Sequence, residues 1–482
     1  MNFPRIIPFA LSALLVAGAA SEAGAPLELS LSKAIQLAME KNLAIKVEAF
    51  NPQIADARAT TKLGAFDPEL RGGFTQQMNR TANDAESQTG AFSAGVGGMT
   101  PLGSSYSLGL NTNALDYSGY NSGAGVSLTQ PLLRGFGTDV NLASLRIARN
   151  NRQGSGWAFR QQVIDVVTQT VYVYNELYAA QRNYEAARRS RELALQFVKD
   201  ECDRVEAGVK TKLDVVTAQA EAAAREEAVI LAQSAIEDNE RLLKQLVTDD
   251  TQTLLSKPIS IVPPPTPAIT TVDVEAGLRD AFRERPDYQQ ALLDLKNRHI
   301  TVITARNQTL PRLDLVGSLN LLGVTGNNAG SSYDFFGDSS SDPNNWAAGV
   351  VLRIPIGNRT ARGGLTEAKL LNAQALVGLH GLEQRIIVEV ANAASGITTS
   401  RKRIDSTLEA LRLAKESLQA GQTRNLEGAA TPFEVLELQK KLMEAEAAEI
   451  RAESDYRKAI SEYHRRTGVT LERNSITISE TK

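Results

Sequence analysis

The hydrophobic pattern of this chain changes its period several times, and each change marks a different kind of element. Between about Gly64 and Thr138 the sequence is rich in glycine, and apolar residues alternate with polar ones, as in Tyr106, Leu108, Leu110, Val126 and Leu128. A period of two is typical of strands that have one apolar and one polar face. We expect about two strands here, within residues 66–131.

The second half of the chain repeats this alternation. Leu313, Leu315, Leu319 and Leu321 are separated by polar residues, and Val350, Leu352 and Ile354 follow. This pattern predicts two further strands within about 311–356, which makes four strands in the chain. Polar loops are expected at Asn79–Gln88 and Ser331–Asn345.

After each strand region the apolar spacing lengthens to three and four residues, which is typical of a coiled-coil seam. One such series is Leu195, Val198, Cys202, Val205 and Val209, and a second is Ile387, Val390, Ala394 and Ile397. An uninterrupted helix of about 65 residues would be roughly 100 Å long. We expect two long helical hairpins, at about 140–248 and about 362–467.

The two halves share one order of residues, which predicts a single unit built twice. In the first hairpin turn stand Gly208, Thr211, Asp214, Val215 and Gln219, and 220 positions later stand Gly428, Thr431, Glu434, Val435 and Gln439. At an offset of 243, the first repeat aligns with the second through Leu29 and Val272, Pro68 and Pro311, and Leu70 and Leu313. At an offset of 224, it aligns through Val126 and Val350, Leu128 and Leu352, and Pro131 and Pro355. We expect the offset to change only at loops.

The turn residues themselves have expected local roles. Gly208 and Gly428 are placed to end the long helices, and Thr211 and Thr431 to cap the returning ones.

This duplication divides the chain into expected segments. Arg5 precedes an apolar run of about fifteen residues followed by small ones, so residues 1–25 are predicted to be a cleavable secretory signal peptide. The first repeat covers 26–256 and the second 268–472. A proline-rich linker at 257–267, which contains Pro263–Pro265, joins them and is expected to be stiff and extended. Residues 473–482 form a tail.

Composition excludes several classes of function. The 52 basic and 55 acidic residues nearly cancel, so no basic footprint for nucleic acid exists. The single cysteine, Cys202, cannot form an intramolecular disulfide, and the three histidines are far apart in sequence. No metal-ligand cluster, nucleotide-binding loop or hydrolase motif occurs, so we expect neither a cofactor nor catalysis.

Four strands cannot close a membrane barrel, because open strand edges are not tolerated in lipid. Either several chains pool their strands, and three chains would pool twelve, or the strands are soluble. In the second case the protein would be a soluble periplasmic coiled-coil adaptor or scaffold.

Several segments carry a resemblance to a known family. The strand ends 126–133 and 350–357, the opening segment 29–38 and the two hairpin turns are similar, in this order, to those of the TolC-type outer-membrane efflux family. The resemblance covers about residues 27–470. It implies an α+β membrane protein in which three copies each lend four strands to one twelve-stranded barrel, continued by a helical tunnel. Pro131 and Pro355 would lie at the junction of barrel and helices.

The resemblance also implies a location and partners. The barrel would lie in the outer-membrane lipid of a Gram-negative bacterium and the helices in the periplasm. The homotrimer would be the passive exit duct of a tripartite efflux pump or of a type I secretion system. Its partners would be a periplasmic adaptor (membrane fusion) protein and an inner-membrane pump of the RND, ABC or MFS type.

In that family acidic side chains ring the pore at the hairpin tips, and the matching positions here are Asp214, Glu434 and Glu437. A tyrosine and an arginine hold neighbouring hairpins together in the family, but this chain has Asn425 and Ala430 at those positions. An alternative role for Asp214 and Glu434 is to stabilise helix N-termini through the helix dipole.

Overall fold

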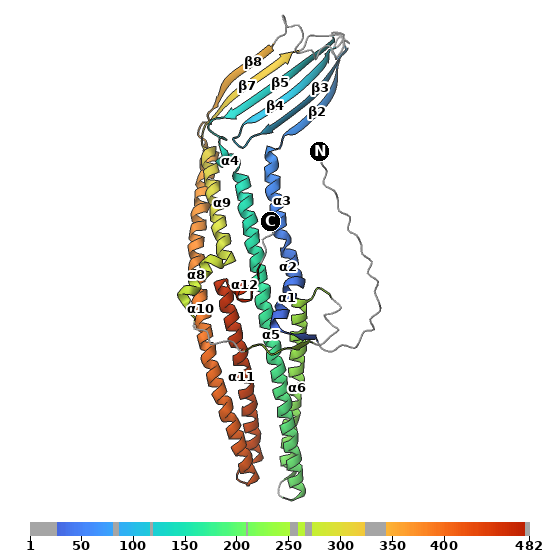
Figure 1. The fold of residues 1–482 in the computed structure, drawn as a ribbon, viewed down its shortest axis with the longest axis vertical. Helices are drawn as coiled ribbons and strands as arrows, with labels where there is room; N and C mark the ends of the chain where they lie inside the picture. Colours follow the sequence, from blue (N-terminus) through green and yellow to red (C-terminus); the bar gives the residue numbers. More distant parts are fainter. Residues whose placement is uncertain are drawn as a thin grey trace.

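The structure is a computed structural model that describes residues 27–80, 86–115, 119–208, 211–250, 259–265, 272–322 and 344–477. The molecule is elongated, with a curved sheet at one end and long helices that run away from it (Figure 1). The expected signal peptide and most of the predicted loop 331–345 lie outside the described residues.

Within the described residues the sheet contains six antiparallel strands, in the order β2-β3-β4-β5-β7-β8. They are β2 (Glu69–Arg80), β3 (Glu86–Met99), β4 (Ser105–Leu115), β5 (Gly119–Pro131), β7 (Arg312–Leu322) and β8 (Asn344–Arg353). The prediction of four strands per chain is therefore wrong, because the first half supplies four strands and the second half two. The expected sum of twelve strands for three copies was based on that count of four.

The alternation of Tyr106, Leu108 and Leu110 lies in β4 and that of Val126 and Leu128 in β5, so the pattern missed β2 and β3, whose glycines interrupt the apolar series. In β3 the apolar residues Phe92, Ala94 and Val96 alternate with serine and glycine, so the contrast between the two faces is weak. A Cβ atom at Gly95 would lie 2.8 Å from the carbonyl oxygen of Leu108, so the close approach of β4 requires glycine there. The β3–β4 hairpin also contributes to the change of offset from 243 to 224, which the sequence analysis assigned to loops alone.

Two long helical hairpins lie side by side below the sheet (Figure 1). After the short α4 (Thr138–Asn141), the first pairs α5 (Ala143–Glu206) with α6 (Lys212–Val247), and the second pairs α10 (Arg359–Leu426) with α11 (Pro432–Thr467). Nearer the sheet, α3 (Phe50–Leu63) packs on α5, and α9 (Pro286–Gln308) packs on both α5 and α10. Among the described residues, α5, α6, α10 and α11 thus form the end far from the sheet, and α3, α5, α9 and α10 the end near it.

A belt of short elements surrounds the middle of the helices. It comprises α1 (Leu31–Lys41), α2 (Leu43–Glu48), α8 (Val274–Glu284) and α12 (Thr470–Arg473), whereas the 3-10 turn η1 (Gly64–Phe66) lies at the end of α3 next to β3. Strand β1 (Leu27–Leu29) pairs in parallel with β6 (Ile259–Ile261), which begins the extended linker between the repeats.

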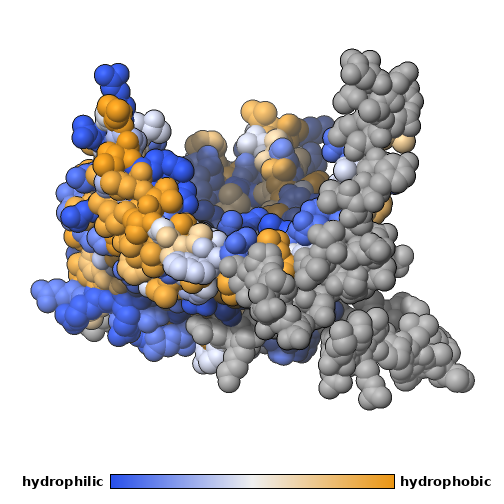
Figure 2. All heavy atoms as spheres, turned by 90° about the horizontal axis from the view of Figure 1, so that it is seen from above, coloured by the Kyte–Doolittle hydropathy of each residue, from blue (hydrophilic) through white to orange (hydrophobic). Residues whose placement is uncertain are grey.

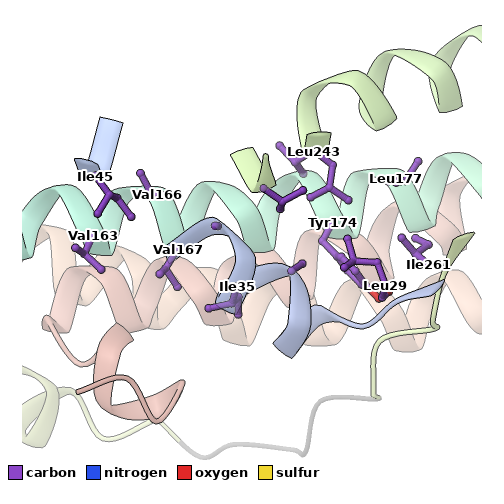
Figure 3. Close-up of a cluster of buried hydrophobic side chains, with 14 of the residues drawn as sticks. Leu29, Ile35, Ile45, Val163, Val166, Val167, Tyr174, Leu177, Leu243 and Ile261 are labelled. Carbon is purple, nitrogen blue, oxygen red and sulfur yellow. The ribbon is translucent and has the colours of Figure 1, made fainter. Parts of the chain in front are cut away.

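The main apolar core lies under this belt (Figure 3). The fully buried Tyr174 of α5 points its hydroxyl at the carbonyl oxygens of Leu29 and Val262, at 2.9 and 2.6 Å. Around it pack side chains of α1, α5, α6 and β6, among them Ile35, Val167, Leu177, Leu243 and Ile261. The amino-terminal strand and the linker are therefore fastened to the same point of α5.

Charged side chains join the two hairpins along the α5–α11 seam. Arg182 of α5 contacts Glu449 at 3.1 Å and Glu453 at 2.5 Å, both on α11. Arg457 of α11 lies over the ring of Tyr178, 5.4 Å from its centroid. Because these pairs are partly shielded from solvent, they specify the register of the two helices more strongly than exposed pairs would.

Arg285, at the start of α9, is the centre of a second network. Its guanidinium contacts Asp287 at 2.7 Å and Glu389 of α10 at 2.8 Å, and Glu389 also pairs with Arg466 of α11 at 3.0 Å. Burial alone would raise the pKa of Asp287, but the hydrogen bond and charge of Arg285 outweigh it and hold that pKa below its usual value. The network therefore fixes three helices to one another.

None of the helices in the described ranges combines the length and apolarity that crossing a bilayer requires. No group of three or more potential metal ligands occurs among the same residues.

Replacing Arg285 with alanine should lower the stability of the folded protein by about 2 to 3 kcal/mol, because Asp287 and Glu389 lose a charged, nearly buried hydrogen-bond donor. A lower midpoint in thermal melting followed by circular dichroism would measure this. The control is Arg298→Ala, which removes an exposed pair with Asp294 and should change little. Equal melting of the two variants would contradict the structural role of Arg285.

Candidate functional site

The hairpin turns form the end of the molecule farthest from the sheet (Figure 1). Gly208 follows α5 with φ of +74°, and Gly428 follows α10 with φ of +76°. Nothing lies within 4 Å of where a Cβ atom would stand at either position. The left-handed conformation that ends each long helix, and not lack of space, therefore explains these glycines.

Each returning helix begins with a threonine cap. The backbone N–H and the hydroxyl of Thr211 both donate to Oδ2 of Asp214, at 3.0 and 2.8 Å. At the second turn the hydroxyl of Thr431 accepts a hydrogen bond from the backbone N–H of Glu434, at 3.3 Å, and Pro432 occupies the first turn. The two repeats thus build the same turn with slightly different chemistry.

The three acidic residues expected at the pore lie on these turns. The carboxylate of Asp214 takes part in its own helix cap, which supports the capping role. Glu434 is exposed and Glu437 is half-buried, and no ion pair of either side chain occurs within the described part of the chain. One chain alone does not form a ring, so their role at a pore depends on other copies.

A contact that the sequence analysis missed joins the two hairpins just above the tips. Nη1 of Arg204 on α5 donates to Oδ1 of Asn425 on α10 at 2.7 Å and pairs with Oε1 of Glu201 at 2.9 Å. The amide nitrogen of Asn425 donates in turn to the carbonyl oxygen of Ala430 at 3.0 Å. We call Arg204, Glu201 and Asn425 the tip clasp.

The tip clasp uses the two positions at which this chain departs from the family that it resembles. Asn425 supplies its side chain and Ala430 its backbone carbonyl, so the residue changes do not leave the hairpins unconnected. Glu201 is fully buried, and a small apolar cluster packs nearby, formed by Phe197, Ala218, Leu418, Val435 and Leu436. The available sequence signal for this contact was Glu201, which stands next to the seam residue Cys202 of the predicted long helix. A carboxylate that becomes buried at such a seam requires a cationic partner.

Pro131 and Pro355 lie where strands give way to helices. Pro131 is the last residue of β5, and Pro355 follows the end of β8. Beyond Pro131, the N–H groups of Leu132 and Arg134 still donate to the carbonyl oxygens of Leu313 and Pro311, at 2.7 and 3.3 Å. Proline has no N–H to continue the strand ladder, so it marks the exit of the chain from the sheet.

Comparison with family models finds that the model described as outer membrane efflux protein matches residues 34–248 and 277–462. Comparison with curated proteins finds no match.

Several solved structures share the fold. The CmeC outer membrane channel of Campylobacter jejuni is 18% identical with a TM-score of 0.70, covering 93% of this chain and 90% of that one. VceC of Vibrio cholerae is 17% identical with a TM-score of 0.69, covering 91% and 96%. The MtrE outer membrane channel of Neisseria gonorrhoeae is 19% identical with a TM-score of 0.66, covering 93% and 91%. At such identities the likeness establishes the fold.

Arg204→Ala should loosen the tips, because the buried Glu201 loses its cation and Asn425 its donor. A loss of about 2 kcal/mol corresponds to roughly thirtyfold faster backbone hydrogen exchange around residues 201–206 and 425–430. Exchange in the sheet should not change. The control Arg188→Ala removes an exposed pair with Glu192 and should leave the tips unchanged. Normal protection of the tips in Arg204→Ala would mean that the clasp does not hold the hairpins.

Proposed function

Because the chain belongs to the outer membrane efflux protein family, we propose that three copies form the passive exit duct of an efflux or secretion machine. As an outer-membrane efflux protein, it has its sheet in the outer membrane of a Gram-negative bacterium and its helices in the periplasm. Membership of this family disfavours the soluble adaptor considered above. The family is one of channels and not of enzymes.

The observation that carries the trimer proposal is the open sheet. Strands β2 and β8 are its two edges, and neither edge has a partner within the described chain. In lipid no water satisfies unpaired backbone N–H and C=O groups, so a spanning sheet must close on itself. Further copies are the simplest source of the missing partners, and helices that continue from every copy would extend the closed wall as a tunnel.

The side-chain pattern of the sheet supports its placement in lipid. One row of paired residues crosses all six strands and is apolar throughout, namely Leu70, Val96, Leu108, Val126, Leu319 and Trp346. The adjacent row, on the opposite face, is small or polar, namely Arg71, Gly95, Gly109, Gly125, Asn320 and Asn345. Seen from above, hydrophobic residues gather on the outside of the curved wall (Figure 2).

Apolar side chains at the tips support docking of a periplasmic adaptor. Leu426, Leu213 and Phe433 are 76%, 71% and 69% exposed at the ends of the hairpins, where solvent alone would favour polar residues. A tip-to-tip contact with an adaptor would cover them. The adaptor would connect the duct to an inner-membrane pump of the RND, ABC or MFS type, which would select the substrate.

The acidic residues at the hairpin tips lead us to propose a charged gate there. Three copies would bring Asp214, Glu434 and Glu437 together as up to nine carboxylates around one mouth. Like charges in such a ring attract cations and repel anions. Capping by Asp214 is compatible with this role, because the cap keeps the carboxylate at the tip of the helix.

The first test is assembly and conduction. The folded protein extracted in detergent should have the mass of a trimer, because its sheet edges are satisfied only between copies. The same sample should form water-filled channels in planar bilayers. A stable folded monomer in detergent would overturn the proposal, as would a soluble protein released from membranes by carbonate.

The second test concerns the mouth. The wild-type channel should prefer cations and be blocked by multivalent cations added on the periplasmic side. The triple variant Asp214→Asn, Glu434→Gln and Glu437→Gln should lose most of this selectivity and keep its trimer, since asparagine can still accept the hydrogen bonds of the cap. Glu192→Gln, far from the tips on an exposed face of α5, is the matched control. Unchanged selectivity in the triple variant would place the constriction elsewhere.

A further inference from the structure

The first repeat contributes two more strands to the wall than the second, and these strands are β3 and β4. The duplication aligns β2 with β7 through Leu70 and Leu313, and β5 with β8 through Val126 and Val350. In the second repeat the aligned strands β7 and β8 pair directly. In the first repeat, β3 and β4 stand between β2 and β5. This hairpin is therefore an insertion into the duplicated unit.

The inserted hairpin continues the wall and does not fold away from it. Its backbone pairing is unbroken on both sides, over twelve residue pairs between β2 and β3 and eleven between β4 and β5. Its apolar residues face the same side as those of the other strands, since Val96 and Leu108 stand in register between Leu70 and Val126. On the opposite face Ser107 and Ser127 share a hydrogen bond of 2.7 Å. A plug or an extracellular flap would not need this continuous division into two faces.

The directions of the edge strands suit closure between copies. Strand β2 follows α3 and runs away from the helices, whereas β8 runs toward α10. Strand β2 of one copy and β8 of the next are therefore antiparallel. An even number of strands per chain keeps every pair in the ring antiparallel, as in known bacterial outer-membrane barrels.

Resting on the proposed trimeric duct, we infer that three copies close a barrel of eighteen strands, in which β2 of each copy pairs with β8 of the next copy. The partner is thus a second and a third copy of this chain. The inserted β3–β4 hairpins supply six of the eighteen strands and widen the membrane passage.

The strand count sets the width of the barrel. With strands about 4.8 Å apart and tilted by about 40°, eighteen strands give a circumference of roughly 110 Å, against roughly 75 Å for twelve. Twelve helices, four from each copy, packed 8–10 Å apart also give roughly 110 Å. The eighteen-stranded barrel therefore meets the helical tunnel without a narrowing, and its small luminal residues, such as Gly95, Gly109 and Gly125, add little bulk. The restriction of passage then falls to the periplasmic tips.

Cysteine crosslinking in the full chain tests the edge pairing, with Cys202→Ser as the background. Leu70→Cys, Gly72→Cys or Phe74→Cys on β2 is combined with Val350→Cys on β8, all on the apolar face. At least one of these pairs should form disulfide-linked dimers and trimers on denaturing gels. The matched control pairs Val350→Cys with Ala94→Cys on the interior strand β3, and it should give no link between chains.

A second pair distinguishes the alternative barrel. If β2 paired directly with β5 as β7 pairs with β8, Leu70→Cys and Leu128→Cys would link within one chain, whereas the inferred arrangement holds them on strands three spacings, at least about 14 Å, apart. That intrachain link in a conducting trimer would overturn the eighteen-stranded barrel and leave the duct standing. Absence of any trimer would overturn both.

Two arginine variants keep the inference testable should the cysteine pairs fail to fold. Leu108→Arg on β4 should face lipid and reduce the yield of membrane-inserted trimer by roughly tenfold or more. Ser107→Arg faces the lumen and should reduce the yield less than about twofold. Equal tolerance of both would remove β4 from the wall, and a count of strands by cryo-electron microscopy of the trimer would then give twelve and not eighteen.

Discussion

The unpaired edges of the six-stranded sheet constrain everything else in this protein. A backbone hydrogen-bonding group left unsatisfied in lipid costs several kcal/mol, and each edge presents a row of them. In the proposed trimer the chain would therefore complete its membrane structure only with other copies, and its folding and its assembly would be one process. The even strand number, the opposite directions of β2 and β8, and the continuous apolar row from Leu70 to Trp346 all agree with closure by identical copies.

The long helices below the sheet are subject to a different constraint, which is how they are held to one another. In the proposed duct a wall one helix thick would have water on both sides, so a thick apolar core could not hold it together. The structure concentrates apolar packing in one belt around Tyr174 and uses charged networks elsewhere, at Arg182, Arg285 and Arg204. Such partly buried pairs stabilise less than apolar packing would, but they fix the register of long helices that would otherwise slide.

The tips illustrate how one turn design is reused with different contacts. Glycines in the left-handed conformation end both long helices, and threonines cap both returning ones. The clasp between hairpins, by contrast, joins the two repeats through unlike residues, Arg204 of α5 and Asn425 of α10. Asn425 and Ala430 stand at the positions where the family resemblance implies a tyrosine and an arginine.

Much of this architecture could be read from the sequence, because it depends on local periodicity and on turn chemistry. The three-and-four spacing gave the long hairpins, and the repeated glycine and threonine positions gave the turns at 208–214 and 428–434. Strands β2 and β3 were missed, because their glycines weaken the alternation, and a glycine-rich strand is recognisable only when its neighbour is in place. Gly95 shows this, since the carbonyl oxygen of Leu108 excludes a side chain there.

The pairing of residues far apart in the chain was likewise beyond the sequence. Arg204 and Asn425 are more than two hundred positions apart, and only the packing of one hairpin on the other brings guanidinium and amide within hydrogen-bonding distance. The sequence by itself thus determined the elements and the duplication. The tertiary structure alone decided the strand count, the sheet edges and the clasp, because each of these depends on which distant backbone or side chain satisfies a polar group.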